Sequence, residues 1–342
     1  MAAQLPIEDS SAIISVVIPS HNSSSTLREC LSAVFASDYR RFEVLVVDDA
    51  SEDGSDEIAK SYPVNLTRLP GNMGAAYARN QGIDKAKGEI VLFLDSDIII
   101  RDDSLSRVME DFNTNPQVDG VAGIYSKATR YRGFFSRYKH SVWRYRFMMG
   151  DSQEDSFTTA FLAVKRQVLK KRRFDEAYKA ASIEDIELGR MLIESGHRFM
   201  LDKGLEAEHV KSVSFGLFCR NQFARSKDIA MAWRSKNAQS FYLKPSRKNK
   251  YAKNYILRVP LSMMMILMLA AALLSGNVLL LTVPVALVIA SAYLEGGFLE
   301  YCRSEYGILF AIGCVLAYFI DGAVSGAGVL AGAMQSMAGG RM

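Results

Sequence analysis

Three short apolar runs, each followed by a polar loop, constrain the fold of this chain more than any other feature. The runs occupy residues 13–19, 42–47 and 89–94, and stretches that suit helices separate them. This alternation predicts an α/β fold built on an open, mostly parallel sheet. In such a sheet the carboxyl ends of the strands share one edge, and ligands bind beyond that edge.

Asp95-Ser96-Asp97 is the most informative motif expected at this edge, because its two carboxylates directly follow the 89–94 run. Proteins usually bind Mg²⁺ through one or two carboxylates together with substrate phosphates, so the pair suits a nucleotide diphosphate. The triplet is weak by itself, since an acidic turn after a strand has the same sequence.

Other loops add polar groups to the same edge. Residues 20–25 follow the first run, and the acidic residues 48–55 follow the second. Asn72 and Gly74 precede the next helical stretch, where a glycine permits close approach of the backbone to a ligand. An ordinary helix start explains that segment nearly as well.

Together these motifs resemble the family 2 glycosyltransferases, which are inverting enzymes of GT-A fold that use nucleotide-sugar donors. The matching pieces are residues 17–22 (VIPSHN), 46–55 (VVDDASEDGS), 71–74 (GNMG), 78–80 (ARN) and 93–97 (FLDSD). Their order and spacing are more specific than any one motif. The resemblance covers about residues 12–235 and implies a Rossmann-like GT-A catalytic domain over residues 1–235.

The resemblance implies a donor pocket in the first half of the chain. Asp49 would hydrogen-bond the nucleotide base, Ser20 and His21 would line the base pocket, and Asp95 would face the ribose or the sugar. His21 stands where the family often has tyrosine, which leaves the nucleotide open, with a UDP-sugar favoured over a GDP-sugar. The residues expected to bind the nucleotide sugar are Pro19, Ser20, His21, Asn22, Asp49, Asn72, Gly74, Asp95 and Gln222.

The resemblance also implies a divalent metal, Mg²⁺ or Mn²⁺. Asp97 would bind the metal that bridges the diphosphate, and His209 is a second candidate ligand for which a polar role without metal fits equally well. Arg79 and Asn80 lie in a matching motif, and a structural role suits them as well as a functional one.

Residues 182–193 predict a helix with a serine cap and acidic residues in its first turn. Capping alone explains these acids, but the segment also resembles the family's Glu-Asp motif, whose aspartate removes the proton from the acceptor hydroxyl. Asp185 is therefore expected to be the catalytic base, and Glu184 a supporting or sugar-binding acid.

Gln222 and Arg225 resemble the family's Gln-x-x-Arg-Trp motif, although Ser226 occupies the tryptophan position. Arg225 is expected to stabilise the departing diphosphate, because a planar cation suits the charge that develops there. The missing tryptophan argues against processive polymer synthesis.

The C-terminal part of the chain predicts a membrane region over residues 259–334, after a basic linker at residues 236–258. Residues 259–294 contain no charged residue and, with Gly276-Asn277 as a turn, predict a hairpin of two short spans. A third apolar stretch, residues 306–334, is broken only by Asp321. This acid is either functional within the membrane or close to the end of a short span.

Charge and glycine patterns in this region predict orientation and packing. Between Lys211 and Arg258, lysine and arginine far outnumber the single acid, Asp228, which predicts a catalytic domain on the cytoplasmic side of the plasma membrane. Small-residue spacing in the third stretch favours close helix packing within the chain or a homo-oligomer. The glycines concerned are Gly322, Gly326, Gly328 and Gly332.

Residues 131–147 mix aromatic and basic side chains, as an amphipathic helix in the headgroup region does. Nucleic-acid binding uses similar residues. The net charge of only +4 and the apolar segments favour lipid over nucleic acid, with a solvated basic helix as the alternative.

The expected function is that of a membrane-bound, metal-dependent glycosyltransferase of hexosyltransferase type acting on a lipid or lipid-linked acceptor. A non-catalytic nucleotide-sugar-binding subunit and a polyprenyl-phosphate glycosyltransferase are the alternatives. A polyprenyl phosphate is already an anion and needs no base, so a base at Asp185 favours a hydroxyl acceptor.

Overall fold

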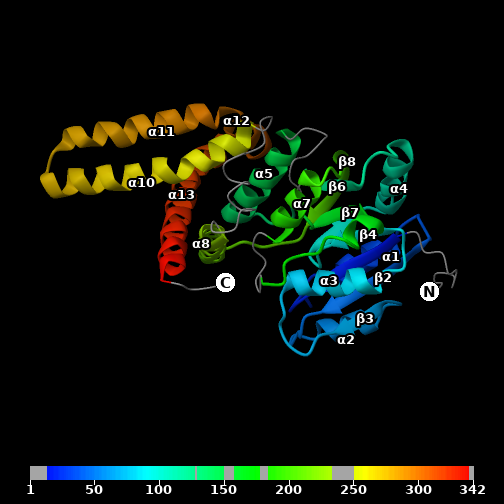
Figure 1. The fold of residues 1–342 in the computed structure, drawn as a ribbon. Helices are drawn as coiled ribbons and strands as arrows, with labels where there is room; N and C mark the ends of the chain where they lie inside the picture. Colours follow the sequence, from blue (N-terminus) through cyan, green and yellow to red (C-terminus); the bar gives the residue numbers. More distant parts are fainter. Residues whose placement is uncertain (1–13, 128, 150–157, 178–183, 233–249, 339–342) are drawn as a thin grey trace. The chain divides into compact units, whose positions relative to one another are not determined.

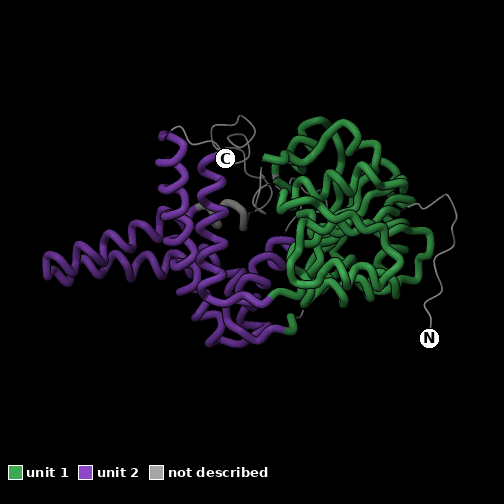
Figure 2. The backbone as a smooth tube through the Cα atoms, turned by 90° about the horizontal axis from the view of Figure 1, so that it is seen from below, with its two compact units in different colours: residues 1–130, 150–211 green, residues 131–149, 212–342 purple. Residues whose placement is uncertain are grey.

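The structure is a computed structural model that describes residues 14–127, 129–149, 158–177, 184–232 and 250–338. The chain forms two compact units (Figure 1, Figure 2). Unit 1 comprises residues 1–130 and 150–211, and unit 2 comprises residues 131–149 and 212–342. This division differs from the boundary expected at residue 235, because two helices from the middle of the chain pack with the C-terminal helices. The basic linker expected at residues 236–258 lies largely outside the described residues.

Unit 1 is built on an eight-stranded sheet with the order β3-β2-β1-β4-β7-β6-β8-β5. β1 pairs in parallel with β2 and β4, β2 with β3, and β6 with β8, whereas β7 runs antiparallel to β4 and β6, and β5 to β8. This sheet confirms the predicted mostly parallel α/β fold. The strands are β1 (Ile14–Ser20), β2 (Phe42–Asp48), β3 (Asn65–Arg68), β4 (Ile90–Leu94), β5 (Ile98–Ile100), β6 (Gly120–Tyr125), β7 (Phe161–Lys165) and β8 (Phe199–His209).

The three apolar runs of the sequence form the adjacent strands β1, β2 and β4. Every residue of β4 is buried, as expected for a strand covered on both faces. Helix α3 packs directly on this part of the sheet, since a Cβ at Gly82 would overlap the Val17 side chain. The helices of unit 1 are α1 (Leu27–Phe35), α2 (Ser55–Lys60), α3 (Ala75–Lys85), α4 (Ser104–Thr114), α6 (Arg166–Leu169) and α7 (Glu184–Glu194).

Strand register brings the polar loops of unit 1 to one edge. Ser20 at the end of β1 lies opposite Asp48 at the end of β2, and the parallel β4 ends on the same side. Asn22 and Ala50, just beyond these strands, have φ values of 50° and 55°. Non-glycine residues adopt this left-handed conformation at an energetic cost, and such residues gather in functional loops.

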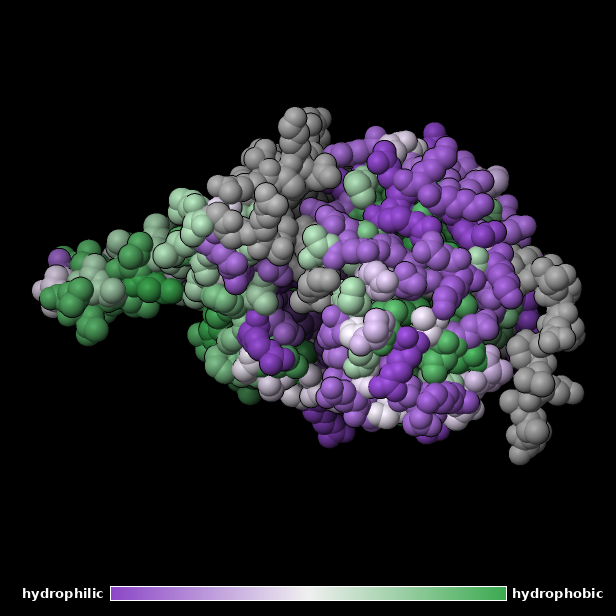
Figure 3. All heavy atoms as spheres, turned by 60° about the horizontal axis from the view of Figure 1, so that its bottom comes forward, coloured by the Kyte–Doolittle hydropathy of each residue, from purple (hydrophilic) through white to green (hydrophobic). Residues whose placement is uncertain are grey.

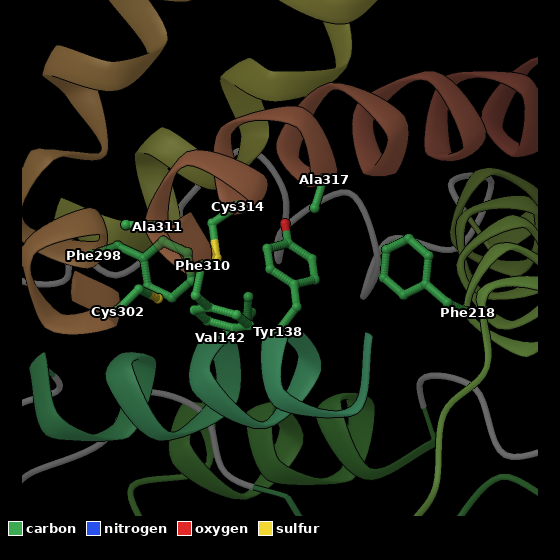
Figure 4. Close-up of a cluster of buried hydrophobic side chains, with 9 residues drawn as sticks. All are labelled: Tyr138, Val142, Phe218, Phe298, Cys302, Phe310, Ala311, Cys314 and Ala317. Carbon is green, nitrogen blue, oxygen red and sulfur yellow. The ribbon is translucent and has the colours of Figure 1, made fainter. Parts of the chain in front are cut away.

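Unit 2 is helical, with a core of aromatic and small side chains (Figure 4). Tyr138 and Val142 of α5 are buried in this core beside Phe218 of α8. Aromatic side chains of the segment expected to lie in the headgroup region therefore pack against protein. The helices are α5 (Phe134–Met149), α8 (Phe215–Ala232), α10 (Lys250–Ser275), α11 (Thr282–Leu294), α12 (Gly296–Tyr306) and α13 (Ile308–Met337), with a short 3₁₀ turn, η1 (Val278–Leu281), before α11.

Two described helices are long and apolar enough to cross a membrane: Leu257–Ser275 of α10 and Ile308–Met337 of α13. A third candidate is the pair Val278–Leu294 and Gly296–Tyr306, which is bent by 75°. The chain turns at Gly276-Asn277, as the sequence predicted, with Gly276 at a φ of 66°. Exposed leucines, including Leu273 and Leu274, make the end of this hairpin hydrophobic (Figure 3).

The glycines of α13 are used for packing within the chain. A Cβ at Gly322 would overlap Arg258 O and Ser262 of α10, and one at Gly328 would lie 2.5 Å from Phe223 O of α8. Gly326 faces α10 and Gly332 faces α8 in the same way. The small-residue spacing, expected to favour packing within the chain or a homo-oligomer, thus holds α13 against two helices of its own chain.

Candidate active site

The first part of the site is a polar pocket at the end of β1 and β2. Asp49 is buried and accepts hydrogen bonds from the backbone N–H groups of Met73 and Gly74, at 2.6 and 2.8 Å. His21 Nδ1 lies 2.6 Å from Asp49 O, so it donates there, and Nε2 accepts from Asn72 Nδ2 at 3.1 Å. Three motifs that are distant in the sequence therefore meet at one place, as predicted.

Neighbouring residues complete this pocket. Ser20 is 2% exposed, and its hydroxyl has no hydrogen-bond partner among the described residues. Buried hydroxyls normally have a partner, so Ser20 is available to a ligand. Asn22 fixes the loop, because its N–H donates to Ser51 Oγ and its Oδ1 accepts from Glu52 N, both at 2.9 Å. Pro19 is the penultimate residue of β1.

Arg79 links the Asp-x-Asp motif to the start of α7. Its guanidinium donates to Asp95 Oδ1 and to Glu184 Oε1, each at 2.9 Å, and only 4% of Arg79 and of Glu184 is exposed. Burial lowers the pKa of Arg79, but the charges of Asp95, Glu184 and Asp185 outweigh burial and raise the pKa above its ordinary value. Sequence reasoning left the role of Arg79 open, and the structure places it between the two acidic motifs.

The residues next to this bridge have different surroundings. Asp185 is half-buried and follows Glu184 in the first turn of α7. The serine expected to cap this helix, Ser182, lies outside the described residues. Asn80 donates to Phe174 O at 3.0 Å and accepts from Phe174 N at 3.1 Å, which is a structural role.

Asp97 and His209, the two candidate metal ligands, lie close together. β5 pairs with the end of β8, with Ile98 opposite His209, which brings His209 Nε2 to 3.4 Å from Asp97 Oδ2. Lys211 Nζ is 3.3 Å from the same oxygen. Burial alone would raise the pKa of Asp97, but the hydrogen bond and charge of His209 and the charge of Lys211 hold it well below its usual range.

This donor set fits a divalent cation that completes its coordination with substrate phosphates. A carboxylate and an imidazole both suit Mn²⁺, and Mg²⁺ is commonly held by one or two carboxylates plus phosphate oxygens. Among the residues that the structure describes, no group of three or more His, Cys, Asp or Glu side chains is arranged to hold a metal. Asp97 and His209 are thus two candidate ligands, and further ligands would come from the substrate phosphates.

Gln222, Arg225 and Ser226 belong to α8 in unit 2. The Gln222 side chain accepts a hydrogen bond from Lys139 Nζ at 2.6 Å and donates to Asp321 Oδ1. Its predicted contact with the nucleotide sugar stays a prediction. Arg225 lies over the ring of Trp143, with its Cζ 5.4 Å from the ring centroid.

Asp321 is paired in the interior of unit 2. Besides Gln222, it accepts from Arg258 Nη1, and Ser325 Oγ lies at 3.4 Å. Only 1% of Asp321 and 3% of Arg258 is exposed. A buried acid paired with a buried cation meets the condition under which a charge persists in an apolar helix bundle.

The family comparison agrees with this arrangement. Residues 15–173 match the family model described as Glycosyl transferase family 2. The chain is 35% identical over 114 residues to the Poly-beta-1,6-N-acetyl-D-glucosamine synthase of Staphylococcus epidermidis, covering 32% of this chain and 28% of that protein. It is 33% identical over 120 residues to Glycosyltransferase GlyG of Streptococcus pneumoniae, covering 34% and 40%. The chain therefore matches less than half the length of these relatives.

Among solved structures, the chain resembles the mannosyltransferase PcManGT from Pyrobaculum calidifontis, solved in complex with GDP-Man and Mn²⁺. The TM-score is 0.55 at 18% sequence identity, and the match covers 97% of this chain and 88% of that one. At this identity the likeness concerns the fold. Taken with the family match and the strand order, it supports a glycosyltransferase family 2 domain of GT-A fold in the first half of the chain, followed by helices that are candidates to span a membrane.

Proposed function

We propose that this protein is a membrane-bound inverting glycosyltransferase that moves a sugar from a nucleotide-sugar donor to a hydroxyl of a lipid or lipid-linked acceptor, at the cytoplasmic face of the plasma membrane. The observation that carries the proposal is the bridge from Asp95 through Arg79 to Glu184. It ties the motif expected to face the donor sugar to the helix turn that carries Asp185. The bridge would thereby hold the donor sugar and the proposed base on one framework.

The chemistry is a single displacement. Asp185 takes the proton of the acceptor hydroxyl as the hydroxyl oxygen forms a bond to the anomeric carbon. The bond from that carbon to the diphosphate oxygen breaks, and its electron pair leaves with the nucleoside diphosphate. Arg225 stabilises the charge that develops on this leaving group. Attack from the opposite face inverts the anomeric configuration.

The donor is held by groups of unit 1. Asp49, His21 and Asn72 surround the expected base position, and the Ser20 hydroxyl is available there. Asp97 and His209 would hold Mg²⁺ or Mn²⁺, which when bound supplies positive charge to the diphosphate. A UDP-sugar is proposed as donor, and a GDP-sugar is the alternative, as bound by the mannosyltransferase of similar fold.

The first test is nucleotide release by the detergent-purified protein, with UDP- and GDP-sugars, Mg²⁺ or Mn²⁺ and a membrane-lipid extract. We expect release to require metal and lipid, and to fall at least 100-fold in Asp185→Asn, since one catalytic acid or base contributes about 10²–10⁴-fold. Asp97→Ala should also lower release, because it removes a proposed metal ligand. Glu187→Gln is the matched control, because Glu187 lies in the same first turn of α7.

The alternatives give different results in the same assay. If Asp185→Asn keeps near-normal turnover with a polyprenyl phosphate, the acceptor group is a phosphate and not a hydroxyl. Tight nucleotide binding without turnover under all these conditions would favour a non-catalytic subunit.

A further inference from the structure

We infer that Trp143 of α5 is a positioning residue for Arg225 of α8. The inference rests on the proposed function of Arg225 at the leaving diphosphate. The guanidinium carbon of Arg225 lies 5.4 Å from the centroid of the Trp143 ring, and both side chains are half-buried. This distance is within the range of an attractive contact between a cation and an aromatic ring.

Position 226, which follows Arg225, has no room for an aromatic side chain. Ser226 is 8% exposed, and a Cβ added at Gly328 of α13 would lie 3.0 Å from its Cβ. The same Cβ would lie 2.5 Å from Phe223 O, so the backbones of α8 and α13 touch here. An indole at position 226 would force these helices apart. The ring that contacts Arg225 comes from another element, α5.

Two side-chain contacts, about one helical turn apart, join α5 to α8. Lys139 donates to Gln222 at 2.6 Å, and Trp143 contacts Arg225. Lys139 and Trp143 are four residues apart on α5, and Gln222 and Arg225 are three apart on α8, so each pair lies on one helix face. The rings of Tyr138 and Phe218, 5.9 Å apart edge to face, pack beside the contact between Lys139 and Gln222. The Trp143 ring is thus held at a fixed place relative to α8.

Contact with an indole orients a guanidinium without neutralising it. Among the described residues, no carboxylate lies within salt-bridge distance of Arg225. Arg258 differs, because Asp321 compensates its charge. Burial lowers the pKa of Lys139 to about 7, and while Asp321 opposes this shift, Arg225 adds to it, so Arg225 contributes positive potential to its surroundings. Arg225 is therefore both oriented and available to an anionic group.

A double-mutant cycle on the full-length, detergent-purified enzyme tests the inference. We expect Trp143→Leu to lower kcat about 3- to 30-fold with little change in the KM for the acceptor, and Trp143→Phe to retain most of the activity. In an Arg225→Ala background, Trp143→Leu should have no further effect. Arg146→Gln is the matched control, because Arg146 also lies over the Trp143 ring, at 5.3 Å. Multiplicative losses in the double variant would overturn the inference.

A binding readout separates this inference from the proposed function. The chain has two tryptophans, so Trp233→Phe leaves Trp143 as the only fluorescent indole. We expect UDP or GDP with Mn²⁺ to change Trp143 emission in this variant and to leave it unchanged when Arg225→Ala is added. Nucleotide that binds by calorimetry without changing the emission would overturn the inference, even if the enzyme turns over. Full turnover by Arg225→Ala would instead overturn the proposed role of Arg225.

Discussion

Arg79 Nη1 lies 2.9 Å from Glu184 Oε1 in the interior of unit 1, although 105 residues separate the two in the chain. The same guanidinium holds Asp95 at 2.9 Å. One cation therefore serves two carboxylates from two motifs, and the position of the α7 first turn relative to β4 depends on it.

Removing this cation should destabilise the protein and abolish turnover. Arg79→Leu removes the cation that pairs with the buried Glu184, and breaking a buried ion pair from one side costs about 3–5 kcal/mol. Arg101→Leu is the control, since Arg101 pairs with Asp103 at the surface, where a pair contributes about 0–1 kcal/mol. Denaturant unfolding measures both. If both variants lose the same free energy of unfolding, the Arg79 bridge stabilises the protein no more than a surface ion pair does.

Asp49→Asn should weaken nucleotide binding. The amide offers one oxygen where two backbone N–H groups now each have a carboxylate oxygen, so the 72–74 loop loses a charge-assisted hydrogen bond. We expect this loss to raise the Kd for the nucleotide about 10- to 100-fold, as measured by calorimetry with UDP and GDP. Asp53→Asn is the control, because Asp53 also accepts backbone hydrogen bonds, from Ser24 and Ser55, outside this pocket. An equal fall in affinity for both variants would count against a base pocket at Asp49.

Asp321→Leu should destabilise unit 2, because it removes the carboxylate that pairs with the buried Arg258. We expect a loss of about 3–5 kcal/mol, recovered in large part by the double variant Asp321→Leu/Arg258→Met. Thermal unfolding of the detergent-purified protein checks both variants. A double variant no more stable than the single one would mean that the pair is required for the helix arrangement itself.

Asp111→Asn should stabilise the protein at high pH. Burial and the charge of Asp202 raise the pKa of Asp111 to about 7, so the folded state binds a proton that the unfolded chain has released. Stability therefore falls as the pH rises from about 4 to 7. Asp111→Asn does not lose stability in this way, so the difference in stability between the variant and the original protein should grow from pH 5 to pH 8. Because the site is partly solvated, we expect less than about 1 kcal/mol. A melting-temperature difference between the two proteins that does not change with pH would contradict a raised pKa of Asp111.

The pocket around Asp49 could be predicted from the sequence for a topological reason. His21 and Asp49 follow parallel strands, and the carboxyl ends of such strands meet at one edge whatever the side chains are. The convergence of Asp97 and His209 was expected only through the family resemblance. It depends on the antiparallel pairing of β5 with β8, which a three-residue strand hardly signals in the sequence.

The contacts of long side chains could not be predicted in the same way. Arg79 could serve the helix or the site equally, because the reach of a guanidinium across 105 residues depends on the packing of α3 and α7. The mixture of aromatic and basic residues in α5 is common to helices that contact lipid and helices that contact protein. Ser226 was the available signal, since the ring that follows the arginine in the family motif is missing here, and the Trp143 ring contacts Arg225.

The glycines of α13 also set an order of events during biosynthesis. Residues 215–232 leave the ribosome before residues 308–337 have been made, yet α8 packs on Gly328 and Gly332 of α13. Helix α8 can therefore pack against α13 only after α13 has been made and has folded. We expect chains that fail to form α13 to lack the proposed transferase activity, which would then begin only after the proposed membrane segments are complete.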